Sequence, residues 1–233
     1  MSDSFILNSK SGYEGTKKEW DEFLKCWNSS LNLEGTIFSG ESNVNIFTHP
    51  VTSSSVLTKE VELKIKLPKS LTDFLYVTNG MKLIGFDDEI SEILSLSKIE
   101  LFANSIYSQD YKMWIRGDFE ANATDEEYFV YDSKQDPIES RDYYLKTSVV
   151  LSKAMHSGVV LLNPKVQSKD GEMEILFLSA RLPGILRFRS FGHFMKYAYY
   201  KSVHSPEFDY IYEESLYENS CANHLTVNYV LAQ

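Results

Sequence analysis

Apolar residues recur at helical spacing in three stretches of the chain. Thr16 is followed three residues later by Glu19, which is the pattern of a capping box at the start of a helix. A second helix is predicted over residues 67–80, which begin with Leu-Pro and end with Asn-Gly, two pairs that suit the two ends of a helix. A third is predicted over residues 190–200, with Ser190 as its cap.

Strand patterns occupy much of the remaining sequence. They combine alternating apolar and polar positions with β-branched and aromatic residues. Turn pairs such as Asp-Pro, Asn-Pro and Asp-Gly separate the later ones, so short antiparallel connections are expected. Strands are predicted over residues 43–48, 61–66, 125–133, 143–152, 157–164 and 172–180, and a short strand followed by a helical turn over residues 91–104.

These elements predict an α+β fold, a mainly antiparallel sheet with helices packed on it. A length of 233 residues suits one large domain or one domain with an added subdomain. We expect residues 1–66 to form an N-terminal helix and strands packed on a main domain of residues 67–200, followed by an acidic segment of residues 201–233. The predicted core contains Leu71, Phe74, Leu75, Val160, Leu162, Ile175, Phe177, Phe191 and Phe194.

The chain is acidic, with a formal net charge of −10. This charge argues against nucleic acid and anionic membranes as partners, because both require clustered Lys and Arg. The acids concentrate in residues 117–142, with nine acids against two basic residues, and in residues 202–233, with five acids and no Lys or Arg. Both segments also contain several tyrosines, so an acidic, tyrosine-rich surface that attracts a basic partner is predicted.

The two cysteines, Cys26 and Cys221, are too few for a disulfide framework. We therefore expect free thiols in a reducing compartment. The N-terminal residues lack the basic and apolar regions of a signal peptide, and no apolar run is long enough to span a membrane. A cytoplasmic protein is predicted.

The polar residues form no pattern that is typical of catalysis. No two histidines have metal-ligand spacing, and neither a nucleophile elbow nor a phosphate-binding glycine loop is present. Glu172 and Glu174 lie two residues apart, so both are expected on the solvent side of one strand, whereas a glycosidase needs carboxylates across a cleft. His193 is expected at a solvated helix position. We predict no catalytic residue, no metal and no cofactor; Arg181, Arg187 and Arg189 are expected as surface partners of the two glutamates.

The order of several short motifs resembles that of the SUKH superfamily, the family of a fungal cell-wall-synthesis regulator and of many bacterial immunity proteins. The resemblance covers residues 67–200, and it departs from the family where Met173 and Leu182 stand in place of common tryptophans and Phe188 in place of tyrosine. The matching residues are Leu67-Pro68, Asn79-Gly80, Leu161-Leu162-Asn163-Pro164, Gly171-Glu172, Glu174, Pro183-Gly184, Arg187 and Ser190-Phe191.

The resemblance implies a SUKH-like fold and a non-enzymatic binding protein, an immunity protein that neutralises a cognate toxin domain by direct contact in the cytoplasm. Toxins of this kind often act on nucleic acid and have basic surfaces, which agrees with the acidity of the chain. A regulatory scaffold for cellular enzymes and a small enzyme remain alternatives, and the oligomeric state is open. The predicted partner-binding residues are Asp118, Glu120, Asp125, Glu126, Glu127, Tyr128, Tyr131, Asp132, Glu213 and Glu214.

Overall fold

Helices and a mainly antiparallel sheet make up the computed structural model of this chain, which confirms the predicted α+β class. The structure describes residues 5–33, 45–87, 90–106, 122–154, 158–179, 181–203 and 220–227. The helices are α1 (Lys17–Leu33), α2 (Ser53–Leu63), α3 (Lys69–Leu75), α5 (Asp125–Tyr128) and α6 (Phe191–Val203). Short 3-10 helices are η1 (Leu96–Lys98), η2 (Phe102–Asn104), η4 (Asp132–Lys134), η5 (Asp142–Thr147) and η7 (Cys221–His224).

The strands form two sheets. The larger has the order β4-β5-β7-β8-β9, and its neighbours in this order are antiparallel. β1 adds to it in parallel, with Phe5 beside Val166 near the end of β7. The smaller sheet has the order β2-β3-β6. The strands are β1 (Phe5–Ile6), β2 (Met81–Asp87), β3 (Ile90–Ile93), β4 (Glu100–Leu101), β5 (Val149–Val150), β6 (Ser152–Ala154), β7 (Val159–Gln167), β8 (Met173–Leu178) and β9 (Ile185–Phe188).

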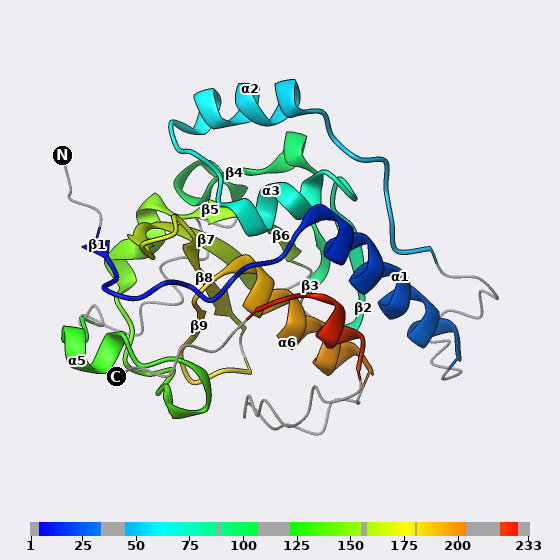
Figure 1. Cartoon of the computed structure of the whole chain (residues 1–233). Coiled ribbons are helices and arrows are strands. Elements are labelled where there is room, and N and C mark those ends of the chain that lie inside the picture. The colour runs from blue at the N-terminus through cyan, green and yellow to red at the C-terminus, as the bar shows by residue number, and fades with distance from the viewer. Residues whose placement is uncertain are drawn as a thin grey trace.

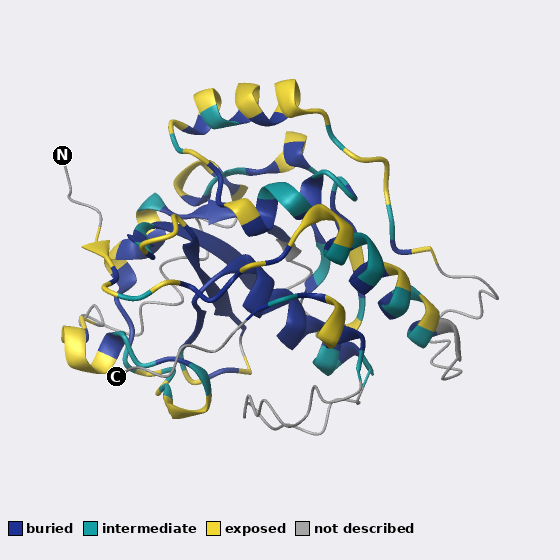
Figure 2. Ribbon diagram, viewed as in Figure 1, coloured by how far each residue is buried: buried dark blue, intermediate teal, exposed yellow. Residues whose placement is uncertain are grey.

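An aromatic core joins α1, α3 and α6, which lie together beside the sheets (Figure 1). The Trp20 ring lies 5.4 Å from that of Phe74 and 5.9 Å from that of Phe191, measured between ring centroids. α6 is buried along most of its length (Figure 2). All nine predicted core residues are confirmed, since each is at most 2% exposed.

Both faces of the larger sheet are covered at β8. Phe177 of β8 contacts Phe194 of α6 on one side, whereas Glu174 of the same strand bonds to tyrosines of residues 122–147 on the other. All six residues of β8 are therefore buried. The prediction that Glu172 and Glu174 face solvent is wrong, because it assumed that one face of the sheet was open to water; each is 1% exposed.

Three predicted strands are wholly or partly helical in the structure, and in the one expected over residues 143–152 the 3-10 helix η5 takes up residues 143–147. Thr52 caps the start of α2, since its hydroxyl accepts a hydrogen bond from Ser55 N. Residues 61–63 belong to this helix, so the strand expected over residues 61–66 is wrong. In the segment predicted as a strand over residues 125–133, a capping box forms α5, with Thr124 and Glu127 bonding each other's backbone. In the α2 and α5 segments the hydrogen bonds of the helix cap, and not the alternation of apolar residues, determined the local structure.

Other local predictions have mixed outcomes. Thr16 caps α1 and Ser190 caps α6, because their hydroxyls accept hydrogen bonds from Glu19 N and His193 N, as predicted. In the segment predicted as a strand over residues 43–48, Phe47 forms only an isolated bridge to Met81, and residues 43–44 lie outside the described ranges.

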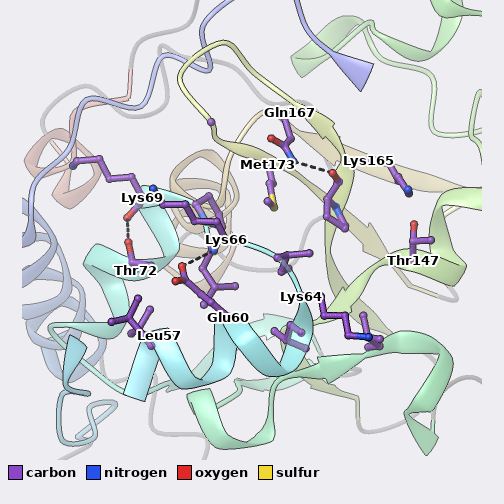
Figure 3. Close-up of a pocket in the computed structure, with 18 of the residues that line it drawn as sticks. Leu57, Glu60, Lys64, Lys66, Lys69, Thr72, Thr147, Lys165, Gln167 and Met173 are labelled. Atoms are coloured by element: carbon purple, nitrogen blue, oxygen red, sulfur yellow. Dashed lines mark hydrogen bonds between the residues drawn. The ribbon is translucent and has the colours of Figure 1, made fainter. Parts of the chain in front are cut away.

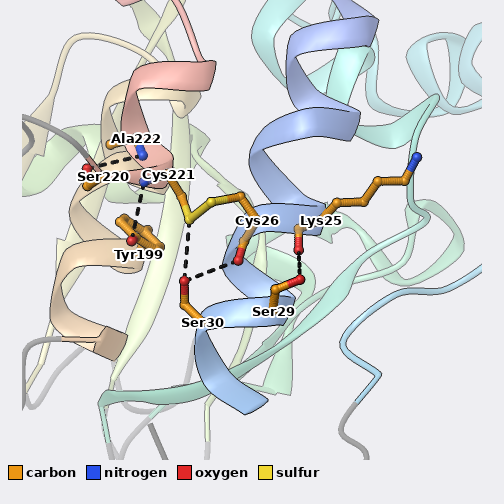
Figure 4. The surroundings of a disulfide bond; sticks show 8 residues. All are labelled: Lys25, Cys26, Ser29, Ser30, Tyr199, Ser220, Cys221 and Ala222. Carbon is orange, nitrogen blue, oxygen red and sulfur yellow. Dashed lines mark hydrogen bonds between the residues drawn. A yellow bond between two sulfur atoms is a disulfide. The ribbon is translucent and has the colours of Figure 1, made fainter. Parts of the chain in front are cut away.

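The two cysteines form a disulfide that joins α1 to η7 (Figure 4). Cys26 and Cys221 are 195 positions apart in sequence, but their Cα atoms lie 5.5 Å from each other. Cys221 N donates to the Tyr199 hydroxyl of α6 at 3.4 Å, so η7 also packs on the last helix. The prediction of two free thiols is wrong, because folding brings together two side chains that the sequence holds far apart.

Candidate binding surfaces

Glu174 is the centre of a buried hydrogen-bond network. Its carboxylate accepts bonds from the Tyr128 hydroxyl at 2.6 Å, the Tyr131 hydroxyl at 2.8 Å and the Asn163 amide at 2.8 Å. Burial raises the pKa of Glu174, and these bonds together with the Arg187 charge act in the opposite direction. Tyr128 and Tyr131 are 1% and 4% exposed, so their prediction as partner-binding anchors is wrong. Both rings are structural, since they satisfy a carboxylate that would otherwise be buried alone.

Glu172 caps the start of α3 from across the fold. It accepts a hydrogen bond from Ser70 N at 2.8 Å and a second from the Ser70 hydroxyl. Burial raises the pKa of Glu172 to about 7, while the bonds from Ser70 oppose this change. The carboxyl is thus a structural group that titrates near neutral pH.

This pKa predicts a pH dependence that Glu172→Gln removes. The folded protein holds the proton up to pH about 7, whereas the unfolded chain releases it near the ordinary value of 4.5. The contribution of Glu172 to stability is therefore complete below pH 4.5 and falls by about 3 kcal/mol as the pH rises through 7. Glutamine keeps an acceptor for Ser70 N and does not titrate.

Urea unfolding of both proteins at several pH values between 4.5 and 8 measures this effect. The difference in unfolding free energy between wild type and variant isolates Glu172, because the other titrating groups are common to both. The wild type should lose stability relative to the variant across this range. Parallel pH profiles would show that Glu172 has an ordinary pKa in the folded state.

Other polar residues for which solvent exposure was predicted are also buried. Arg187 is 1% exposed and donates to the carbonyl of Glu139 at 2.5 Å, with its guanidinium 4.8 Å from the Tyr128 ring centroid. His193 is 1% exposed, and its Nδ1 lies 2.8 Å from the Ser190 hydroxyl. Burial, reinforced by the Arg189 charge, lowers the pKa of His193 well below its usual range, so its ring is neutral. The predictions of surface positions for these residues are wrong, because residues of the 122–147 segment cover Arg187 and because α6 is buried at His193.

Among the described residues of the predicted acidic surface, the exposed acids gather on α5. All three of its first-turn acids are exposed; Asp125 is also paired with Arg141 at 2.5 Å, and Glu127 also belongs to the capping box, which leaves Glu126. Asp132, half-buried, lies 3.7 Å from Arg189 Nε. The remaining predicted partner-binding residues lie outside the described ranges: Asp118, Glu120, Glu213 and Glu214.

Apolar side chains border this acidic helix. Phe5 stacks on Phe129, the residue that ends α5, with 4.4 Å between ring centroids, and it is still 38% exposed. Its neighbour Ile6 is 63% exposed. In Figure 2 the exposed residues of β1 and α5 lie on the same side of the molecule. We call Phe5, Ile6 and Glu126 the acidic surface.

The chain also has a hollow of opposite charge, which we call the lysine groove. Its volume is about 970 Å³, and it lies between α2, the start of α3 and the ends of β7 and β8 (Figure 3). Five lysines line it against two carboxylates, Glu60 and Asp170. The lysines are Lys64, Lys66, Lys69, Lys146 and Lys165.

Sequence reasoning missed this groove. Three of its lysines are close in sequence, around the Leu-Pro pair that precedes α3, and this spacing was the available signal. Lys146 and Lys165 come from η5 and β7, so only the fold adds them. The net negative charge of the chain therefore gave no indication of a basic groove.

Within the described residues, no group of three or more His, Cys, Asp or Glu side chains is placed to hold a metal ion. None of the described helices combines the length and the apolar character that a membrane crossing needs. No family model matches the chain, and no curated protein is significantly similar to it.

Proposed function

We propose that the chain is a non-enzymatic binding protein that neutralises a protein partner by direct contact, as the immunity proteins of the SUKH superfamily do. The observation that carries the proposal is the burial of the ionisable side chains that could otherwise act in catalysis. Glu172, Glu174 and His193 are buried and bonded within the fold, where each stabilises an element or a network. The exposed residues of the acidic surface provide charged and apolar groups, and protein interfaces are built from such groups.

The acidic surface supports a basic partner. Glu126 is exposed, and Phe5, which stacks on Phe129 at the end of α5, supplies together with Ile6 apolar area of the kind that anchors interfaces. The net charge of −10 adds a long-range attraction for a positively charged domain. A toxin that acts on nucleic acid has such a surface, because it must bind phosphate. This proposal retains the charge expected from the sequence and replaces the two buried tyrosines with Phe5 and Ile6.

Glu126→Lys and Phe5→Ala separate the two contributions to binding. The partner to use is the product of the gene next to this one, studied by surface plasmon resonance at low and high salt. Glu126→Lys should slow association several-fold and reduce its salt dependence, since charge steers the encounter. Phe5→Ala should instead speed dissociation, because it removes a contact formed after docking. Glu14→Lys makes the same change of charge at an exposed residue before α1 and is the control.

Three results would contradict the proposal. The adjacent protein does not bind, or Glu126→Lys and Glu14→Lys have the same association rate, or Phe5→Ala leaves dissociation unchanged. Binding to constitutive cellular enzymes in place of a toxin would favour the regulatory scaffold.

A further inference from the structure

We propose that the lysine groove is a second binding site, which takes an acidic segment of a protein partner with apolar side chains between its carboxylates. This inference is independent of the acidic surface and its basic partner. The two sites have opposite charge and are built from different elements, α2 and α3 for the groove and β1 and α5 for the acidic surface.

The carboxylates of the groove are engaged within the chain. Glu60 accepts a hydrogen bond from Leu67 N at 2.8 Å, and Asp170 accepts bonds from the backbone N–H and the hydroxyl of Ser11 at 3.0 and 2.8 Å. In contrast, no described residue forms an ion pair with Lys64 or Lys66, and both side chains are exposed. With five lysines against two carboxylates, the groove has a net positive charge, which an acidic ligand would complement.

The backbone conformation of Lys64 is a second observation that points to a role for its side chain. Lys64 caps the C-terminus of α2 with φ 57°, in the left-handed region where glycine is usual at a helix end. A lysine at this position is strained, and glycine would relieve the strain. Lysine at this position has a backbone strain that glycine would avoid, which fits a role for its charge in binding.

The apolar lining favours a protein segment over a nucleic acid. Leu57 and Leu101 line the groove together with Met173, and Tyr76 is its one aromatic side chain among the described residues. A nucleic-acid site commonly stacks bases on several aromatic rings, whereas aliphatic side chains suit leucine-like residues of a peptide. Leu57 is 61% exposed, so its contact area is available.

α2 is the outer wall of the groove and is held to the body by few residues. Val56, Lys59 and Leu63 are its buried residues, and the Lys59 ammonium donates to the carbonyl of Ile99 at 3.0 Å. Its other face is exposed in Figure 2. An amphipathic ligand can thus lie along α2, with its apolar side chains on Leu57 and its carboxylates near the lysines.

Fluorescence anisotropy of a short labelled peptide tests this inference on the full-length protein. The peptide alternates glutamate with leucine, and a counterpart carries lysine in place of glutamate. The acidic peptide should bind and its counterpart should not. Lys64→Glu with Lys66→Glu should raise the Kd of the acidic peptide by about tenfold or more, and added salt should raise the wild-type Kd. Lys17→Glu with Lys134→Glu changes the net charge equally at exposed residues outside the groove and should leave the Kd near that of wild type.

Two further variants separate binding from folding. Lys64→Gly should weaken the binding of the acidic peptide while the Tm stays the same or rises, because strain is relieved as charge is lost. Leu57→Ser should weaken it as well, whereas Val61→Ser, on the same helix but outside the groove lining, should not.

The inference is overturned if the acidic peptide fails to bind, or binds the Lys64→Glu, Lys66→Glu variant as tightly as the wild type. It is equally overturned if single-stranded DNA or inorganic polyphosphate binds at the groove in place of the peptide. A failure of Glu126→Lys to affect the basic partner would not alter these measurements, so the two proposals are tested separately.

Discussion

Replacing Glu174 with alanine is expected to lower the free energy of unfolding by about 3–5 kcal/mol, as the loss of one partner in a buried charged network does. The carboxylate is 1% exposed and accepts hydrogen bonds from Tyr128, Tyr131 and Asn163. Alanine would leave these three donors without their acceptor in a space that water does not reach. Each lost bond has a cost, because a buried donor without a partner keeps its full desolvation penalty.

Glu174→Gln is the matched control. Glutamine has nearly the same shape, its oxygen can accept from two of the donors, and its amide can donate to the remaining tyrosine hydroxyl. Urea unfolding followed by far-UV circular dichroism should therefore show a much smaller loss for glutamine than for alanine. Equal losses for the two variants would mean that the charge, and not the hydrogen bonds, stabilises this network. A loss below about 1 kcal/mol for alanine would contradict the network altogether.

Removal of the disulfide has the second large expected effect. Cys26→Ser with Cys221→Ser should lower the free energy of unfolding by about 2–5 kcal/mol, because the bond closes a very long loop and restricts the unfolded chain. The two residues are separated by 195 positions, which places the expected loss toward the upper end of this range. Urea unfolding with and without a reductant measures the loss. The reductant should shift the wild-type midpoint and leave that of the double variant unchanged.

The redox state of these cysteines also tests the predicted compartment. Disulfides are rare where glutathione and thioredoxin keep thiols reduced. Labelling of free thiols in protein taken directly from cells should modify neither cysteine if the bond is formed there. Labelling of both would fit the predicted cytoplasmic location. If the reductant does not change the stability of purified protein, the bond contributes nothing to the fold.

Features of the chain that depend on neighbouring residues could be predicted from its sequence. Thr16 and Ser190 cap helices as expected, because a cap bonds to a backbone N–H only three residues away. The α+β class and the buried helical faces follow from apolar periodicity in the same way. The capping box of Thr124 and Glu127 was equally visible in the sequence, but aromatic residues after it favoured a strand.

The surroundings of polar side chains were decided by tertiary structure. The spacing of Glu172 and Glu174 on a strand is a local property, but whether water or protein lies opposite depends on what covers the sheet. Residues 122–147 cover one side and provide Tyr128 and Tyr131 for Glu174, while Ser70 of α3 meets Glu172. A partner for a buried carboxylate can come from anywhere in the chain, so sequence spacing alone does not predict it.

Proximity between distant residues was likewise decided only by folding. Cys26 meets Cys221 because α1 and η7 pack on the same helix, α6. In the same way, Lys146 and Lys165 join Lys64 and Lys66 at one groove. The net charge of −10 follows from composition alone, but the fold determines where each charge lies. An acidic chain can therefore have a basic groove, since folding brings lysines from distant segments to line one hollow.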